Sequence, residues 1–297
     1  MDDTIPGGHV PRPESRASAN ALPAGTRVRD YEILHVIGEG GFGIVYAAHD
    51  QTLDRDVAIK EYMPAPLATR GDTRTVAPRS DAQKGAYEAG LRAFIDEAQL
   101  LARFKHPALV EILWSWEENG TAYMAMPLYR GRTVKEWLAQ RPEPVDQTWL
   151  KSLLAPLLDA LESMHRAQVY HRDISPDNVL ILADGRPVLL DFGAARRIVD
   201  NSGDASTVVL KPAFSPIEQY AEDPSMKQGP WTDLYALCAL AYCTIARRAP
   251  PPSVTRIAKD PIRPLGEFAG AGFDADFLEA IEWGLAVRPE QRPQSVD

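Results

Sequence analysis

The pattern of apolar and polar positions changes from strand-like to helix-like along the chain. Residues 31–49 and 56–61 alternate apolar and polar side chains around glycine and turn residues, which predicts β-strands. Residues 82–104 repeat apolar positions at three- and four-residue steps, which predicts a helix. Further elements are expected as strands at 111–116 and 121–126 and as helices at 133–140, 147–167, 231–247 and 274–286. A strand-rich first third before a helix-rich remainder indicates two lobes joined near residues 126–130.

Proline marks the irregular parts of the chain, with 25 in 297 residues against a usual share of about 5%. Residues 1–28 are rich in Pro, Gly, Ser and Ala without apolar periodicity, so we expect a disordered head. Residues 63–81 carry Arg70, Arg74 and Arg79 among Pro, Thr and Gly, which predicts a long basic surface loop. Such a loop could bind a regulator, but a solvated insertion is the simpler interpretation.

Composition and charge exclude several classes of protein. The fractions of hydrophobic (45%) and charged (25%) residues are those of a globular protein. The net charge of −9 argues against a nucleic-acid binder, which needs a basic surface. The longest apolar run, residues 234–246, is too short to span a bilayer, and no signal peptide opens the chain. Cys238 and Cys243 lie in that run, which predicts buried thiols of a reduced, cytoplasmic protein.

A short segment matches the pattern G-x-G-x-x-G, with the residues Gly38, Glu39, Gly40, Gly41, Phe42 and Gly43. The same pattern occurs in plain hairpin turns and in dinucleotide-binding motifs, where the glycines open a helix. Here the chain continues as a strand through Val45, so we expect a hairpin between two strands. Glycine lets backbone amides approach a phosphate chain without a Cβ in the way. The segment therefore predicts a phosphate-binding hairpin.

Lys60 ends the apolar run Val57-Ala58-Ile59 on the next predicted strand. A lysine in such a place is usually an exposed edge charge, and it gains a role only beside a phosphate loop and an acidic partner. Glu97 in the predicted helix is that partner, with its neighbour Asp96 as the alternative. A Lys60–Glu97 ion pair would hold the ammonium group toward the α- and β-phosphates of a nucleotide.

Two further motifs carry the strongest signal in the sequence. Residues 171–178 match H-R-D-x-x-x-x-N, which includes Asp173 and Asn178, and Asp191-Phe192-Gly193 follows thirteen positions after Asn178. The glycine hairpin, the lysine and the glutamate come before these two motifs in the chain, and this ordered set is typical of one protein family. From about residue 31 to its end, it resembles a eukaryotic-like (Hanks-type) bacterial Ser/Thr protein kinase.

The resemblance implies an α+β, bilobal protein-kinase fold. The N-lobe, residues 29–126, would hold a small antiparallel sheet and one regulatory helix. The hinge and a larger helical C-lobe would occupy residues 127–297, where the family continues into a last helix, so a longer natural chain is expected. A membrane anchor beyond these residues would be compatible with a cytoplasmic catalytic domain. The implied partners are ATP and the Ser or Thr hydroxyls of protein substrates.

The resemblance also implies the roles of the site residues. Asp173 would accept or orient the proton of the substrate hydroxyl, and Asn178 and Asp191 would hold Mg²⁺, with Mn²⁺ as the alternative ion. Phe192 would pack behind the helix that bears Glu97. The contacts to the adenine base would come from Val45, Ala58, Met126, Pro127, Tyr129 and Leu180. The resemblance also implies that Glu218 pairs with Arg292 and that Asp233 braces the loop of residues 171–178.

Two positions depart from the family pattern. Ser175 stands where Ser/Thr kinases usually carry a lysine that contacts the γ-phosphate, and Lys211 stands where they carry a threonine. The two changes look reciprocal, which suggests that Lys211 reaches over beside Ser175 and restores the ammonium group. The alternative is that Lys211 is a solvated charge. The absence of the usual lysine also leaves open a nucleotide-binding pseudokinase scaffold with little phosphotransfer.

The sequence as a whole predicts an active, Mg-ATP-dependent Ser/Thr protein kinase. Retention of Lys60, Asp173 and Asp191 together argues against the pseudokinase alternative. A small-molecule kinase is a weaker option, because the long segment that ends in Glu218 is typical of enzymes with protein substrates. Candidate regulatory phosphorylation sites, where a phosphate could pair with Arg172, are Ser202, Ser206 and Thr207.

Overall fold

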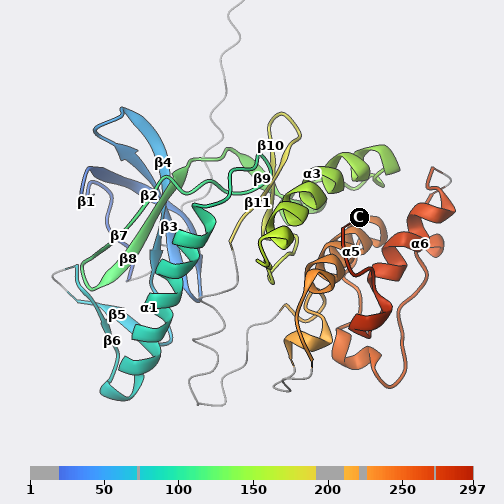
Figure 1. The fold of residues 1–297 in the computed structure, drawn as a ribbon. Helices are drawn as coiled ribbons and strands as arrows, with labels where there is room; N and C mark the ends of the chain where they lie inside the picture. The colour runs from blue at the N-terminus through green and yellow to red at the C-terminus, as the bar shows by residue number, and fades with distance from the viewer. Residues whose placement is uncertain (1–19, 72–73, 192–210, 221–225, 271, 297) are drawn as a thin grey trace, which may run out of the picture.

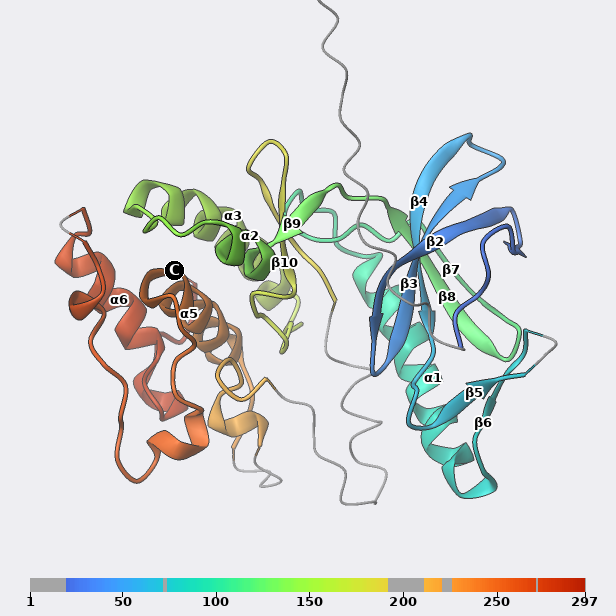
Figure 2. The same cartoon turned by 180° about the vertical axis from the view of Figure 1, so that it is seen from behind.

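The computed structural model describes residues 20–71, 74–191, 211–220, 226–270 and 272–296. They form two lobes that lie side by side, one built from strands and a single long helix, the other mainly from helices (Figure 1). This is the mixed α+β, bilobal architecture that the sequence predicts. Between the two lobes in both views lie the small strands β9 (Gly131–Thr133), β10 (Val179–Leu182) and β11 (Pro187–Leu189) (Figure 2).

The N-lobe is a six-stranded antiparallel sheet covered by one helix. In spatial order the strands are β1 (Arg27–Val28), β2 (Tyr31–Gly40), β3 (Gly43–Asp50), β4 (Arg55–Tyr62), β8 (Thr121–Pro127) and β7 (Trp114–Glu118). Helix α1 (Asp81–Leu101) packs against β7 and β8, and its buried positions, which include Phe94, Glu97, Ala98 and Leu101, recur three and four residues apart. This spacing places them on one face of the helix. The predicted helix and strands are therefore confirmed, except that the strand expected at 111–116 lies at 114–118.

The C-lobe is organised around a central apolar helix. Helix α5 (Pro230–Ala246) is buried over most of its length and packs against α3 (Gln147–Arg166) and α6 (Ala275–Gly284). Helix α2 (Val134–Gln140) begins with a capping box between Thr133 and Glu136, which satisfies two backbone N–H groups at its start. All four predicted helices are confirmed, with ends that shift by at most two residues.

The connections in the C-lobe include short elements. The three-stranded sheet runs in the order β11 (Pro187–Leu189), β10 (Val179–Leu182) and β9 (Gly131–Thr133). Single 3₁₀ turns follow at η1 (Ile217–Gln219), η2 (Ser253–Arg256), η3 (Leu265–Glu267) and η4 (Pro289–Gln291). Strand β10 leads out of the loop of residues 171–178, and β11 leads into Asp191, so this small sheet holds both motifs at the edge of the N-lobe.

The prediction of a disordered head up to residue 28 is wrong for residues 20–28. Strand β1 pairs with β2, and Leu22 is 3% exposed, with its backbone N–H donating to the Tyr46 hydroxyl at 3.1 Å. Leu22 and Val28 join the apolar core of the sheet, which offsets the entropy of ordering this segment. Residues 1–19 lie outside the described part of the chain.

The expected irregular loop at residues 63–81 is a folded insertion. Strands β5 (Ala68–Arg70) and β6 (Val76–Pro78) pair as a hairpin beside the start of α1 (Figure 1). The Val76 N–H donates to the Asn119 carbonyl at 2.8 Å, which joins this hairpin to the turn between β7 and β8. Arg74 and Arg79 are exposed, as predicted, but Arg70 points into the lobe. Strands of three residues carry too little periodicity to be seen in the sequence.

Candidate active site

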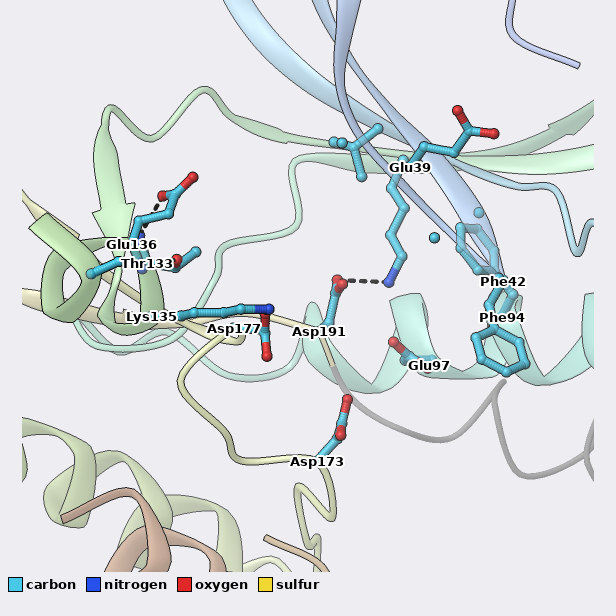
Figure 3. Close-up of a pocket in the computed structure, with 17 residues that line it drawn as sticks. Glu39, Phe42, Phe94, Glu97, Thr133, Lys135, Glu136, Asp173, Asp177 and Asp191 are labelled. Atoms are coloured by element: carbon cyan, nitrogen blue, oxygen red, sulfur yellow. Dashed lines mark hydrogen bonds and ion pairs between the residues drawn. The ribbon is translucent and has the colours of Figure 1, made fainter. Parts of the chain in front are cut away.

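A cavity of about 720 Å³ lies between the lobes. The glycine-rich segment forms its roof, and acidic side chains from both lobes point into it (Figure 3). Four of these acidic residues come from separate elements: Glu97 from α1, Asp173 and Asp177 from the loop before β10, and Asp191 from the segment after β11. Elements that are far apart in the chain thus meet at one site.

The roof of the cavity is the hairpin between β2 and β3. Gly40 pairs with Gly43 in the antiparallel register, and all residues from 38 to 43 line the cavity. A strand follows the glycines, not a helix, which excludes the dinucleotide-binding motif. A Cβ at Gly43 would clash with the carbonyl oxygen of Glu61 on β4, so glycine is required there.

Lys60 projects from β4 into the cavity and contacts Asp191. Its Nζ donates to Asp191 Oδ1 at 2.6 Å, with 13% of the lysine side chain exposed. Glu97 lines the same cavity and is 3% exposed, whereas its neighbour Asp96 is exposed and does not line the cavity. The helix therefore presents Glu97 and not Asp96 to the site. The ion pair between Lys60 and Glu97 stays a prediction.

Asp173 is held by a neighbour in its own loop. The Asn178 side-chain Nδ2 donates to the Asp173 backbone carbonyl at 2.7 Å and to its Oδ2 at 2.6 Å. Asn178 is 8% exposed, and its own backbone N–H donates to the Ser175 carbonyl at 2.9 Å. These bonds fix the direction in which the Asp173 carboxylate enters the cavity.

A buried aspartate from the C-lobe braces the same loop. Asp233 on α5 accepts hydrogen bonds from the backbone N–H groups of His171 (2.9 Å) and Arg172 (2.7 Å), and His165 Nε2 lies 2.9 Å from the same carboxylate. Arg172 has a φ of +68°, a conformation that a non-glycine residue adopts only when its surroundings hold it there. Asp233 supplies that constraint.

His171 connects this loop to the segment before Asp191. Its Nε2 donates to the Leu190 carbonyl at 2.8 Å, and its Nδ1 accepts from the Asp173 N–H at 3.3 Å. Burial lowers the pKa of His171, and one ring nitrogen must stay unprotonated to accept, so the ring is neutral. Asp191 itself has a φ of +29°, which marks a strained backbone at the point where its carboxylate faces Lys60.

Asn178 and Asp191 fit the requirements of Mg²⁺. Since Nδ2 of Asn178 donates to Asp173, its amide oxygen is the atom left to coordinate, and Asp191 offers a carboxylate in the cavity. Mg²⁺ prefers such hard oxygen ligands and completes its shell with waters and substrate phosphates. In the described part of the chain, no group of three or more His, Cys, Asp or Glu side chains forms an all-protein metal site.

The residues expected around the adenine base are only partly on the cavity wall. Val45 lines the cavity, next to Lys60 in the register of β3 and β4. Ala58 pairs with Met126 between β4 and β8, and Leu180 pairs with Thr133 between β10 and β9. The Tyr129 hydroxyl accepts from the Glu111 N–H at 3.2 Å. This side chain is thus engaged away from the base, which leaves the backbone of Pro127 and Tyr129 for the expected hinge contacts.

Several cavity residues carry no recognisable signal in the sequence. Lys135 at the start of α2 donates to Asp177 Oδ1 at 2.8 Å, and both side chains lie to one side of Asp191 (Figure 3). Phe94 of α1 and Phe42 of the glycine hairpin line the same cavity. Asp177 stands at a variable position of the H-R-D motif, and Lys135 lies in an ordinary helix start, so neither could be singled out from its pattern.

Lys211 and Ser175 are in contact, as the reciprocal change in the sequence suggests. Lys211 Nζ donates to Ser175 Oγ at 2.5 Å and lies 3.8 Å from Asp173 Oδ1. Glu218 is fully buried and makes a two-pronged ion pair with Arg292, at 2.7 and 3.2 Å, as expected. Phe192 and the candidate sites Ser202, Ser206 and Thr207 lie outside the described residues.

Known proteins resemble this chain over most of its length. Residues 31–293 match the family model described as the protein kinase domain. The serine/threonine-protein kinase PknK of Mycobacterium tuberculosis is 28% identical over 284 residues, which cover 92% of this chain and 23% of PknK. A probable serine/threonine-protein kinase of Streptomyces coelicolor, SCO3848, is 30% identical over 281 residues, 90% of this chain and 38% of that protein. The chain thus spans well under half the length of these curated relatives.

Solved structures share the fold. The PpkA-294 apo form is 48% identical to this chain and superposes on it with a TM-score of 0.87. The match covers 94% of this chain and 98% of the PpkA-294 chain. The PknI kinase domain of Mycobacterium tuberculosis is 23% identical over 93% of this chain and 95% of its own, with a TM-score of 0.69, and supports the fold alone. None of the helices in the described residues is long and apolar enough to cross a bilayer.

Proposed function

The chain belongs to the protein kinase domain family, and we propose that it transfers the γ-phosphoryl group of Mg-ATP to Ser and Thr hydroxyls of protein substrates. One observation supports this most directly: Lys60, Asp173, Asn178 and Asp191 converge on the cavity beneath the glycine hairpin. Each has the chemistry that phosphoryl transfer requires, because this reaction depends mainly on positioning and on charge stabilisation.

In this proposal the hairpin and Lys60 bind the triphosphate. Backbone amides of residues 38–43 approach the phosphates from above, and the Lys60 ammonium neutralises the α- and β-phosphates. Glu97 is the buried carboxylate on α1. It would orient Lys60 once the bound nucleotide breaks the ion pair between Lys60 and Asp191. The adenine base would lie against Val45, Ala58 and Leu180.

Asp173 would accept the hydroxyl proton of the substrate as the hydroxyl oxygen attacks the γ-phosphorus. Asn178 holds Asp173 in place through a 2.6 Å hydrogen bond to its carboxylate and a 2.7 Å hydrogen bond to its backbone carbonyl. Asn178 and Asp191 would hold Mg²⁺, or Mn²⁺ in its place, which neutralises phosphate charge when bound. The residue set argues against the pseudokinase alternative, because a scaffold would not need the base, its clamp and the metal ligands together.

The test measures phosphate transfer directly. The purified chain is incubated with Mg²⁺ and γ-labelled ATP, alone and with a basic test protein, and is compared with its Asp191→Asn variant. We expect labelling of Ser and Thr by the wild-type chain and at least about 100-fold less by the variant, because the metal ligand is lost. Labelling by the wild-type chain no greater than that by Asp191→Asn would reject the proposal.

Two further features belong to the same proposal. We place the domain in the cytoplasm, where ATP is supplied; its two cysteines are unpaired thiols, and burial raises the pKa of Cys238 to about 12.

We also propose that Ser202, Ser206 or Thr207 is phosphorylated and pairs with Arg172, whose Nε is buried without a hydrogen-bond partner among the described residues. Mass spectrometry after incubation with Mg-ATP tests these sites, and the absence of phosphate at all three would contradict the assignment.

A further inference from the structure

The Lys211 side chain is fixed at the reacting end of the cavity. Its Nζ donates to Ser175 Oγ at 2.5 Å and lies 3.8 Å from Oδ1 of Asp173. Only 22% of the Lys211 side chain is exposed, and Ser175 is fully buried. A solvated surface lysine would extend into water, and a long side chain loses considerable rotamer entropy when it is held in one place. The observed contacts therefore argue against a solvated charge.

Both ends of this contact are anchored in the C-lobe. The Lys211 carbonyl accepts from the N–H groups of Phe214 (2.8 Å) and Ser215 (3.0 Å), which forms a tight turn. The Ser253 hydroxyl on η2 donates to the Ser215 carbonyl at 2.7 Å and ties that turn to the lobe. On the other side, the Ser175 carbonyl is bonded to the Asn178 N–H. The position of the ammonium group is thus set by the fold.

We propose that Lys211 is a further catalytic residue, whose ammonium group binds the γ-phosphoryl oxygens during transfer. The inference rests on the proposed function, in which Asp173 takes the hydroxyl proton. The attacked phosphorus must lie one bond beyond the hydroxyl oxygen that faces Asp173. A cation 3.8 Å from Asp173 is therefore within reach of the phosphoryl oxygens. The neutral Ser175 hydroxyl positions this cation without cancelling its charge.

The step itself is a single displacement. The substrate oxygen forms a bond to the γ-phosphorus, the bond from that phosphorus to the bridging oxygen breaks, and ADP leaves with the electron pair. The hydroxyl proton moves to the Asp173 carboxylate, and Lys211 remains protonated throughout. Fixed positive charge beside the moving phosphoryl group is the kind of preorganised stabilisation that lowers such barriers.

The test replaces Lys211 by Met, which keeps the apolar stem, and by Ala. In both variants we expect kcat to fall by about 10²–10³, the effect of removing one preorganised donor to a transition-state charge. The KM for ATP should change by less than about threefold, since the contact strengthens in the transition state. Lys259→Ala, an exposed lysine of the same lobe, is the matched control and should leave kcat unchanged.

Two measurements separate catalysis from folding. Calorimetric titration measures the binding of Mg-ADP with and without aluminium fluoride, which mimics the transferred phosphoryl group. The wild-type chain should bind the aluminium fluoride complex at least about tenfold tighter than Mg-ADP alone, and Lys211→Met should lose this preference. Exchange of the two partners, Ser175→Lys with Lys211→Thr, should restore at least about tenfold of the activity lost in Lys211→Thr alone, because the ammonium group returns to the same contact.

The possible outcomes distinguish this inference from the function on which it rests. A wild-type chain that transfers no phosphate would overturn the proposed function and the inference with it. An active wild type whose Lys211→Met variant keeps kcat within about threefold would overturn the role of Lys211 alone. The same conclusion would follow if Lys211→Met lost activity but kept its preference for the aluminium fluoride complex.

Discussion

Arg70 and Glu61 form an ion pair inside the N-lobe, with 2.5 Å between Nη2 and Oε2. Their side chains are 6% and 0% exposed. The Tyr46 hydroxyl donates to the same Glu61 oxygen at 2.8 Å, and Arg70 Nε donates to the Asn20 carbonyl at 2.7 Å. The insertion and the N-terminal segment are thereby fastened to β4, the strand that also carries Lys60.

Removal of Arg70 should destabilise the protein strongly. Arg70→Ala leaves the Glu61 carboxylate buried without its cation, and breaking a buried pair in this way costs about 3–5 kcal/mol. The free energy of unfolding, measured in urea, should fall by that amount. Arg74→Ala, at an exposed arginine of the same insertion, should change it by no more than about 0.5 kcal/mol. Equal effects of the two substitutions would show that Arg70 is not a structural anchor.

The glycine hairpin should tolerate a methyl group at one glycine and not at another. A Cβ at Gly43 would clash with the backbone of Glu61, whereas a Cβ at Gly41 would meet no atom within 4 Å. Gly43→Ala should lower the free energy of unfolding by about 1–3 kcal/mol through overpacking, and Gly41→Ala should change it by less than about 1 kcal/mol. Chemical denaturation of the two variants checks this, and unchanged stability in Gly43→Ala would be inconsistent with the register described.

Neighbouring acidic residues on α1 should differ sharply in their effect on activity. Glu97 is buried in the cavity wall and Asp96 is exposed. Glu97→Ala should reduce kcat/KM for phosphate transfer by about 100-fold or more, because Lys60 loses the carboxylate expected to orient it. Asp96→Ala should stay within about twofold of wild type. A Glu97→Ala variant as active as Asp96→Ala would contradict the predicted Lys60–Glu97 pair.

His171 should make stability fall in mild acid. Burial lowers the pKa of His171 in the folded chain below the ordinary value of 6.5, which applies to the unfolded chain. At a pH between the folded and the unfolded pKa, the unfolded chain therefore binds a proton that the folded chain does not. The free energy of unfolding should therefore decrease as pH drops below about 6.5, by up to about 1.4 kcal/mol per pH unit from this residue. Urea titrations at about pH 7.5 and about pH 5.5 should show a smaller loss in His171→Asn. Parallel losses in both proteins would refute this.

The order of motifs along the chain was sufficient to predict the fold and most of the residues that line the cavity. The glycine segment, Lys60, Asp173 and Asp191 belong to patterns with fixed spacing, and α1 and α5 have strong or continuous apolar faces. Such patterns depend only on residues that are near one another in the chain, so they can be recognised without the tertiary structure. The same reasoning failed for residues 20–28 and 63–81, where short segments are ordered only by distant partners such as Tyr46 and Asn119.

Tertiary packing decided the questions that depend on which side chains meet. The one-dimensional pattern placed Arg70 in a surface loop, and only the folded lobe shows it paired with Glu61. The sequence allowed either Asp96 or Glu97 to face the cavity, and the rotation of α1 against the sheet selects Glu97. Lys211 and Ser175 are 36 positions apart in the chain, yet they touch. Periodicity specifies the elements because backbone geometry is local, whereas burial and electrostatic pairing arise only when remote elements come together.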